Sequence, residues 1–266
     1  MGCLLALGLC WAAAPSPAQE PARPEALRVC ADPDNLPFSH QDGSGFENRI
    51  ARLVAADLGL PLRYEWLPDR RGFVRKTMGA NLCDVIMGVP VEFERTLNTA
   101  PYYRSTYVWV ERDRDGIAPP SLDDGRLARV RIGVQLIGDD MAASPPGHML
   151  ARRGLIANVV GFPIAGEQPS AQRMVDALAA GEIDAALVWG PQAGYFARRA
   201  PVPLRVRPIA ATSMLADQRF EFAIAMGVRR SDKALHALLD DVIRRRQADI
   251  DRILAEYAVP TKGTGP

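Results

Sequence analysis

The sequence predicts an α/β fold of two lobes, each built on a doubly wound parallel sheet, with a two-strand hinge between them. Short strands and amphipathic helices alternate over residues 27–89 and again over residues 131–190, an order that gives parallel sheets covered by helices on both faces. In both halves a helix leads into an Asp, Asp84 or Asp184, that opens a buried strand ending in Gly. The 266 residues, 48% of them hydrophobic, are enough for two domains of about 100–150 residues each.

The elements of the first lobe follow from local patterns. Phe46, Ile50 and Leu58 recur at helical spacing and Gly59 supplies the stop. The residues from Leu62 alternate as they do in a strand. In chain order we expect a strand over residues 27–31, a helix over 46–58, a strand over 62–66, a helix around 73–78 and a buried strand over 84–89.

The second lobe repeats this order. Ser170 is the expected N-cap of its second helix, and Gly181 ends that helix. In chain order we expect a strand over residues 131–134, a helix over 149–153, a strand over 159–162, a helix over 170–180 and a strand over 184–190.

Two crossings are expected to join the lobes. Residues 107–110 would lead from the first lobe to the second, and residues 204–209 would lead back. The first lobe would then comprise residues 27–110 and 213–260, and the second lobe residues 111–212.

The end of the chain, from Ser231, is expected to be helical. Leu235, Leu239 and Val242 recur on one face. The run Arg244–Arg246 interrupts this pattern, so we expect these arginines on the solvated side or at a break between two helices.

The first residues have the pattern of a signal peptide. The apolar stretch from Cys3 to Ala14 is too short to span a bilayer, which takes about 20 residues. A small-x-small cleavage site follows at Ser16–Ala18. We expect residues 1–18 to direct the chain to the periplasm and to be removed, which leaves a mature chain without a transmembrane segment. A disordered cytosolic tail is the alternative.

Removal of residues 1–18 leaves two cysteines, Cys30 and Cys83. In an oxidising compartment they are expected to form one disulfide, and two buried free thiols are the alternative. Cys30 lies in one expected strand and Cys83 immediately precedes another, and these two strands are neighbours in a doubly wound sheet, about 4.8 Å apart. Because Cys30 is near the end of its strand and Cys83 at the beginning of its own, the register is the weak point of this expectation.

Charge and motifs exclude several classes of function. Lys+Arg is 32 and Asp+Glu is 31, a net charge of +1, whereas nucleic-acid-binding proteins usually carry a basic excess. The histidines His40, His148 and His236 are scattered without metal-ligand spacing, and no nucleophile elbow surrounds a serine. The acidic pairs at residues 123–124 and 139–140 are typical of turns. We expect no catalytic residue, no metal site and no cofactor in this chain.

A ligand cleft is expected where the strands end, because open α/β sheets bind ligands at the carboxyl ends of their strands. Arg104, just before the first crossing, could hold a carboxylate. Turn glycines and core aromatics are the alternatives for these positions, and for Arg104 the alternative is a salt bridge or an interlobe contact. The candidate cleft residues are Phe38, Ser39, Glu47, Gly88, Val89, Tyr102, Arg104, Gln135, Gly138, Trp189 and Gly190.

Seven short motifs in order resemble those of one family. They occupy residues 28–39, 45–48, 83–90, 101–108, 189–196, 226–230 and 257–260. They look like the quinoprotein dehydrogenase-associated binding proteins, the J component of periplasmic methanol-oxidation systems, which have the type II periplasmic binding protein fold of extracellular solute-binding family 3. The resemblance implies a periplasmic protein that assists a pyrroloquinoline-quinone (PQQ)-dependent methanol or alcohol dehydrogenase. That enzyme carries calcium or a lanthanide and passes electrons to a c-type cytochrome, which is a second partner by resemblance.

Two other functions remain open at this point. A solute receptor for an ABC transporter would bind an amino acid or another small polar solute, and amino-acid-binding relatives hold the α-carboxylate with an Arg upstream of a Pro-Tyr pair. Here Arg95 is the nearest match, but it lies only six positions before Pro101, closer than in those relatives. An enzyme on the same fold, such as a periplasmic dehydratase, would need a general acid or base, and Glu47 is the candidate.

Overall fold

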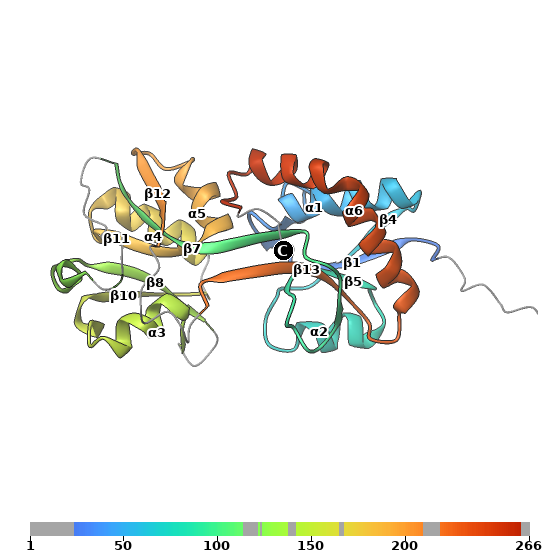
Figure 1. Cartoon of the computed structure of the whole chain (residues 1–266), viewed down its shortest axis with the longest axis horizontal. Helices are drawn as coiled ribbons and strands as arrows, with labels where there is room; N and C mark the ends of the chain where they lie inside the picture. The colour runs from blue at the N-terminus through green and yellow to red at the C-terminus, as the bar shows by residue number, and fades with distance from the viewer. Residues whose placement is uncertain are drawn as a thin grey trace, which may run out of the picture.

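A computed structural model describes residues 24–113, 122, 124–137, 142–164, 168–209 and 219–261. The expected signal peptide lies outside these residues. The chain forms two lobes that lie side by side and are connected by two long strands (Figure 1). Among the described residues, no helix has both the length and the apolar character needed to span a membrane.

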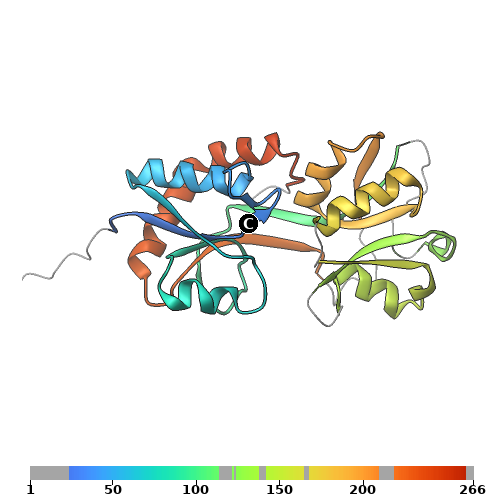
Figure 2. The same cartoon turned by 180° about the vertical axis from the view of Figure 1, so that it is seen from behind.

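The first lobe is built around parallel strands flanked by helices on both faces. Strand β1 (Leu27–Ala31) lies between β4 (Leu62–Trp66) and β5 (Val85–Pro90), and β13 (Glu221–Val228) pairs antiparallel with β5. Helices α1 (Phe46–Leu58) and α6 (Lys233–Glu256) cover one face, and the short α2 (Phe73–Lys76) and η1 (Met78–Ala80) cover the other (Figures 1 and 2). Separate hydrophobic clusters fill the two faces of this sheet.

The second lobe has the same layered design. Strand β8 (Ile132–Ile137) lies between the parallel strands β10 (Val159–Pro163) and β11 (Ala185–Trp189). Helices α4 (Ser170–Ala180) and α5 (Gly190–Ala197) cover one face, and α3 (Pro145–Arg152) covers the other (Figure 2). Each face again has its own hydrophobic cluster. The small elements are β2 (Asp34–Asn35), β3 (Ser39–His40), β6 (Leu97–Asn98), β9 (Ala142–Ala143), η2 (Gly125–Arg129) and η3 (Ile156–Asn158).

The strand that returns from the second lobe to the first is not the one expected from the sequence. Strand β7 (Tyr103–Arg112) pairs at its start with β13 and further along with β11 and β12 (Leu204–Pro208). Residues 204–209 were expected to cross back, but β12 runs antiparallel to β7 and its last residue, Pro208, is still opposite Val108 in the second lobe. The return is made by β13, so the sheets are continuous through the hinge while the hydrophobic core stays divided. The expected start of the returning segment, residue 213, lies outside the described residues, and the lobe boundaries stay a prediction.

One helix is as expected in detail and another differs. Helix α6 continues through Arg244–Arg246 without a break, and these arginines lie on its solvated side, the first of the two expected placements, where they form ion pairs with Asp57, Asp241 and Asp249. Helix α4 begins at Ser170 itself, so Pro169 occupies the N-cap position.

Cys30 and Cys83 form a disulfide with their Cα atoms 5.4 Å apart, and both are buried. The concern about register is resolved by where Cys83 lies. Cys30 is opposite Ile86 in the β1–β5 ladder, but Cys83 precedes β5, in the turn that follows the left-handed residue Asn81. Its position is therefore set by this turn and not by the rise along a strand.

Candidate ligand-binding cleft

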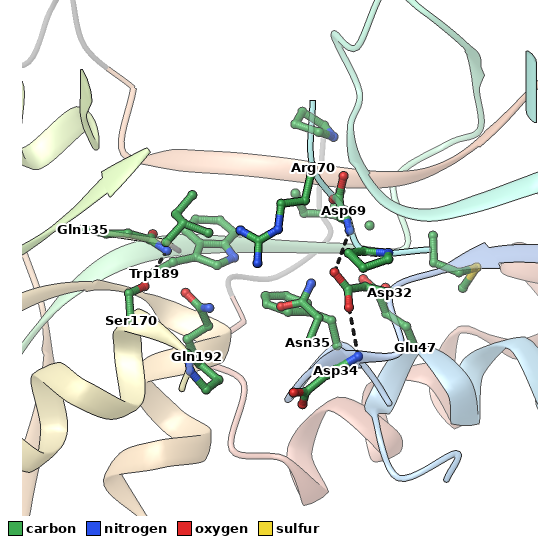
Figure 3. A pocket seen from close by; sticks show the side chains of 18 of the residues that line it. Asp32, Asp34, Asn35, Glu47, Asp69, Arg70, Gln135, Ser170, Trp189 and Gln192 are labelled. Carbon is green, nitrogen blue, oxygen red and sulfur yellow. Dashed lines mark hydrogen bonds between the residues drawn. The ribbon is translucent and has the colours of Figure 1, made fainter. Parts of the chain in front are cut away.

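A cavity of about 640 Å³ lies between the two lobes beside the hinge (Figure 3). The loops after β1 and β4 and the carboxyl-terminal half of β5 form one wall, and residues near the ends of β8, β10 and β11 form the other. The connecting strands β7 and β13 contribute Tyr103, Tyr107, Phe222 and Ile224. The size is within the range of about 300–1,000 Å³ that is typical of small-molecule sites.

Asp32 joins two of the loops in the first-lobe wall. Its carboxylate accepts hydrogen bonds from the backbone N–H groups of Asp34, at 2.9 Å, and Asp69, at 2.6 Å. These bonds hold the loop after β1 against the loop after β4 (Figure 3). A carboxylate that accepts two backbone hydrogen bonds is well stabilised, so Asp32 is a fixed part of the wall.

The charges of the cleft are concentrated on the first lobe. Asp32, Asp34, Glu47 and Asp69 supply four carboxyl groups, and Arg70 supplies a guanidinium group. The second-lobe wall carries uncharged polar groups, and Gln135 donates a hydrogen bond of 2.8 Å to Ser170 there. The polar side chains of that wall are Gln135, Gln168, Ser170 and Gln192.

Glu47, in the first turn of α1, has an unusual environment for a carboxyl group. It is only 9% exposed. Burial, reinforced by the charge of Asp69, raises its pKa to about 8, although a hydrogen bond with the Tyr102 hydroxyl opposes this shift. Loss of hydration and the charge of Asp32 raise the pKa of Asp69 as well. At neutral pH, Glu47 is therefore mostly protonated.

Aromatic rings from both lobes and the hinge line the cavity. Trp189, at the end of β11, packs against Tyr107 with ring centroids 5.3 Å apart and against Phe222 at 5.7 Å. Phe38 lies on the first-lobe side, 5.4 Å from Phe46. These rings give the cleft an apolar surface beside its acidic wall.

Five of the predicted cleft residues line this cavity: Phe38, Glu47, Gly88, Gln135 and Trp189. Their role in ligand binding stays a prediction. Gly138 lies outside the described residues.

The other predicted residues lie behind the cleft wall. Ser39 is buried and its hydroxyl donates a hydrogen bond to the backbone carbonyl of Asp32, at 2.8 Å. Val89 packs on the opposite face of the sheet. Tyr102 is buried, and its hydroxyl accepts a hydrogen bond from the Gly88 N–H. Gly190 begins α5, where an added Cβ would meet the Ser105 hydroxyl at 2.6 Å.

Arg104 is away from the cleft. Alternate residues of a strand point to opposite sides, so Tyr103 lines the cleft while Arg104 lines a second cavity of about 600 Å³. Arg95 is exposed and does not line the cleft either. Neither arginine lines the cleft, where the expected carboxylate would bind.

Several lining residues were not predicted from the sequence, among them Asp32, Asp34, Ser170, Phe222 and those of two further segments. Asp69 and Arg70 follow β4, and the rule that strand ends carry ligand contacts would have found them if applied to that strand. Gln192 lies on α5, a helix that the sequence analysis did not expect. Within the described part of the chain, no group of three or more His, Cys, Asp and Glu side chains could hold a metal ion.

The comparisons with known proteins agree with this architecture. The model of bacterial extracellular solute-binding proteins, family 3, matches residues 27–260. Protein MoxJ of Methylorubrum extorquens (strain ATCC 14718 / DSM 1338 / JCM 2805 / NCIMB 9133 / AM1) is 33% identical over 259 residues, which cover 93% of this chain and 86% of that protein. Protein MoxJ of Paracoccus denitrificans is 31% identical over 252 residues, which cover 88% of each chain.

Two solved structures have the same fold. The periplasmic binding protein XoxJ from Methylobacterium extorquens AM1 superimposes with a TM-score of 0.75 at 37% identity and covers 90% of this chain and 100% of its own. MxaJ from Methlophaga aminisulfidivorans MPT also gives a TM-score of 0.75, at 22% identity, with 89% and 100% coverage. The type II periplasmic binding protein fold is therefore confirmed.

Proposed function

Because the chain belongs to family 3 of the bacterial extracellular solute-binding proteins, we propose that it is a non-catalytic periplasmic binding protein that assists a PQQ-dependent methanol or alcohol dehydrogenase. The observation that carries this proposal is the similarity to MoxJ and XoxJ over most of each chain. The motifs that resemble the J component of methanol-oxidation systems are spread over both lobes. Assistance means docking on the dehydrogenase, or its maturation or activation. The c-type cytochrome that accepts electrons from the dehydrogenase is a further candidate partner.

The cleft also supports a role other than ordinary amino-acid uptake. Arg95, the nearest match to the arginine that holds an α-carboxylate in amino-acid-binding relatives, is exposed and outside the cleft. Arg104 faces the second cavity. The cleft's own arginine, Arg70, comes from a different segment, the loop after β4.

Deletion of the gene tests the proposal. We expect alcohol-dependent dye reduction by the periplasmic fraction to fall and to recover when the gene is restored in trans. The PQQ and metal content of the purified dehydrogenase would show whether the loss reflects maturation. Normal activity with full PQQ and metal loading in the deletion strain would contradict the proposal.

A second candidate is a solute receptor for an ABC transporter. It is favoured by the cavity of about 640 Å³ with polar groups on both walls. A thermal-shift screen of amino acids and small acids separates the two functions, because a ligand at about 100 times its dissociation constant stabilises a protein by about 2.7 kcal/mol. Tight binding of one amino acid, together with unchanged dehydrogenase activity in the deletion strain, would favour the receptor.

A further inference from the structure

One wall of the cleft carries carboxyl groups that form no ion pair with a Lys or Arg side chain among the described residues. Within the described residues, no Lys or Arg forms an ion pair with Asp32, Asp34, Glu47 or Asp69; Asp34 has only His40 nearby, at 3.8 Å. Arg70 makes no ion pair with these groups, and its side chain extends toward Trp189 (Figure 3). The acidic wall therefore has an excess of negative charge that a ligand can balance.

The environment of Glu47 indicates the sign of the charge on that ligand. It is more than nine-tenths buried and still lines the cavity. Its neighbours Asp69 and Tyr102 supply a second carboxyl and a hydroxyl, but no positive charge. Burial of a carboxylate without a positive partner is unfavourable, so a cation placed between Glu47 and Asp69 would gain from both groups.

The rest of the cavity suits an apolar stem attached to that cation. Phe38, Trp189 and Phe222 present aromatic surface from the first lobe, the second lobe and the hinge. Aromatic faces attract cations, and tryptophan does so most strongly. The uncharged amides and hydroxyl of the second-lobe wall can accept hydrogen bonds from an ammonium group but cannot neutralise a carboxylate.

We propose that the cleft binds an organic cation, an ammonium or guanidinium group on an apolar stem, which Glu47 and Asp69 hold on one side while Trp189 covers its stem. This inference concerns the ligand of the cleft and stands independently of the dehydrogenase. In this proposal, Arg70 carries a positive charge like that of the ligand, so Arg70 does not take part in recognising the ligand. An amino-acid receptor would require the opposite role for Arg70, because its guanidinium would hold the α-carboxylate.

Isothermal titration calorimetry of the whole protein at about pH 8.5 tests the proposal, because Glu47 is then largely ionised and alkylamines remain charged. The probes are n-butylammonium, its uncharged counterpart butyramide, the dianion glutarate and L-lysine. We expect n-butylammonium to bind at least tenfold more tightly than butyramide, and glutarate to give no binding heat. Absence of binding by n-butylammonium, or equal binding of butyramide, would overturn the proposal.

Variants identify the groups responsible. Glu47→Gln and Asp69→Asn should each weaken n-butylammonium binding at least fivefold, whereas Arg70→Gln should strengthen it. Arg104→Gln is the matched control, because Arg104 lines the other cavity, and it should leave binding unchanged. Thermal unfolding of each variant checks that it is folded.

Two outcomes would replace the proposal with another ligand class. Glutarate binding that is lost in Arg70→Gln would identify an anionic ligand. L-lysine binding at least a hundredfold tighter than n-butylammonium, and lost in Arg70→Gln, would identify an amino-acid site. Because no dehydrogenase is present in these titrations, their failure and the failure of the accessory function are distinguishable.

Discussion

The carboxyl group of Glu47 lies against the backbone of Gly88, where an added Cβ atom would overlap Glu47 Oε1. Gly88 also has a φ of +71°, a left-handed conformation that glycine adopts without steric penalty. Two independent constraints thus select glycine at this position of β5. The contact brings the first turn of α1 close to the sheet at the base of the cleft.

Replacement of this glycine should therefore destabilise the protein. For Gly88→Ala we expect a loss of about 1–3 kcal/mol in the free energy of unfolding, because alanine must adopt a left-handed backbone and displace the Glu47 carboxyl. Urea denaturation followed by circular dichroism measures this change. Gly125→Ala is the matched control, since an added Cβ there meets nothing within 4 Å. Equal midpoints for the two variants would contradict the prediction.

The buried Glu47 should make stability depend on pH. Its pKa is raised from 4.5 to about 8 in the folded protein, so between these values the folded state holds a proton that the unfolded state has lost. Stability should therefore fall as the pH rises from about 4.5 to about 8, by roughly 3–5 kcal/mol from this group. Asp69, whose pKa is also raised, contributes in the same direction.

The Glu47→Gln variant isolates the contribution of Glu47. Its free energy of unfolding should exceed that of the natural protein by an amount that grows from about pH 5 to about pH 8 and is constant above. The neighbouring groups Asp69, Tyr102, Tyr103 and Tyr64 are present in both proteins, so their titration cancels to first order. A difference that is the same at every pH would exclude a raised pKa for Glu47.

Elements whose ends are set by residues close to them in the sequence could be predicted from local sequence patterns. Helix α1 ends at Leu58 as expected, because Gly59 adopts a left-handed conformation, with φ 62°, and its N–H bonds to the carbonyls of Ala55 and Ala56. Helix α5 was missed because Gly190 and Pro191 are typical of a loop. Pro191 instead occupies the first turn of the helix, where its missing N–H is no disadvantage.

The cleft was harder to predict, because it depends on which side of a strand each residue faces and on how the lobes meet. Tyr103 and Arg104 are adjacent in sequence but line different cavities, and only the pairing of β7 with β13 decides which is which. Asp69 and Arg70 reach the cleft because the loop after β4 is held to Asp32. That hydrogen bond joins segments that are far apart in the sequence.

Trp189 should report the occupancy of the cleft by its fluorescence. It lines the cavity between Tyr107 and Phe222, so a ligand that contacts its ring changes the polarity around it. We expect n-butylammonium to change the emission spectrum of the natural protein and to have no such effect on Trp189→Phe. Trp66→Phe is the control, because Trp66 stacks on Tyr64 at 4.5 Å outside the cleft and its loss should leave the response intact. A response that disappears in Trp66→Phe and persists in Trp189→Phe would place the ligand elsewhere.

The disulfide should contribute much of the stability of the first lobe. Cys30 and Cys83 are separated by 53 residues, and closing a loop of that length reduces the entropy of the unfolded chain enough to stabilise the fold by about 4 kcal/mol. Protein without residues 1–18 should show no free thiol when it is denatured without a reductant, and two after reduction. Its free energy of unfolding in urea should fall by about that amount when a reductant is present. The Cys30→Ala/Cys83→Ala double variant should be equally destabilised and insensitive to the reductant, because the bond alone responds to it. Two free thiols per chain before reduction would contradict the prediction.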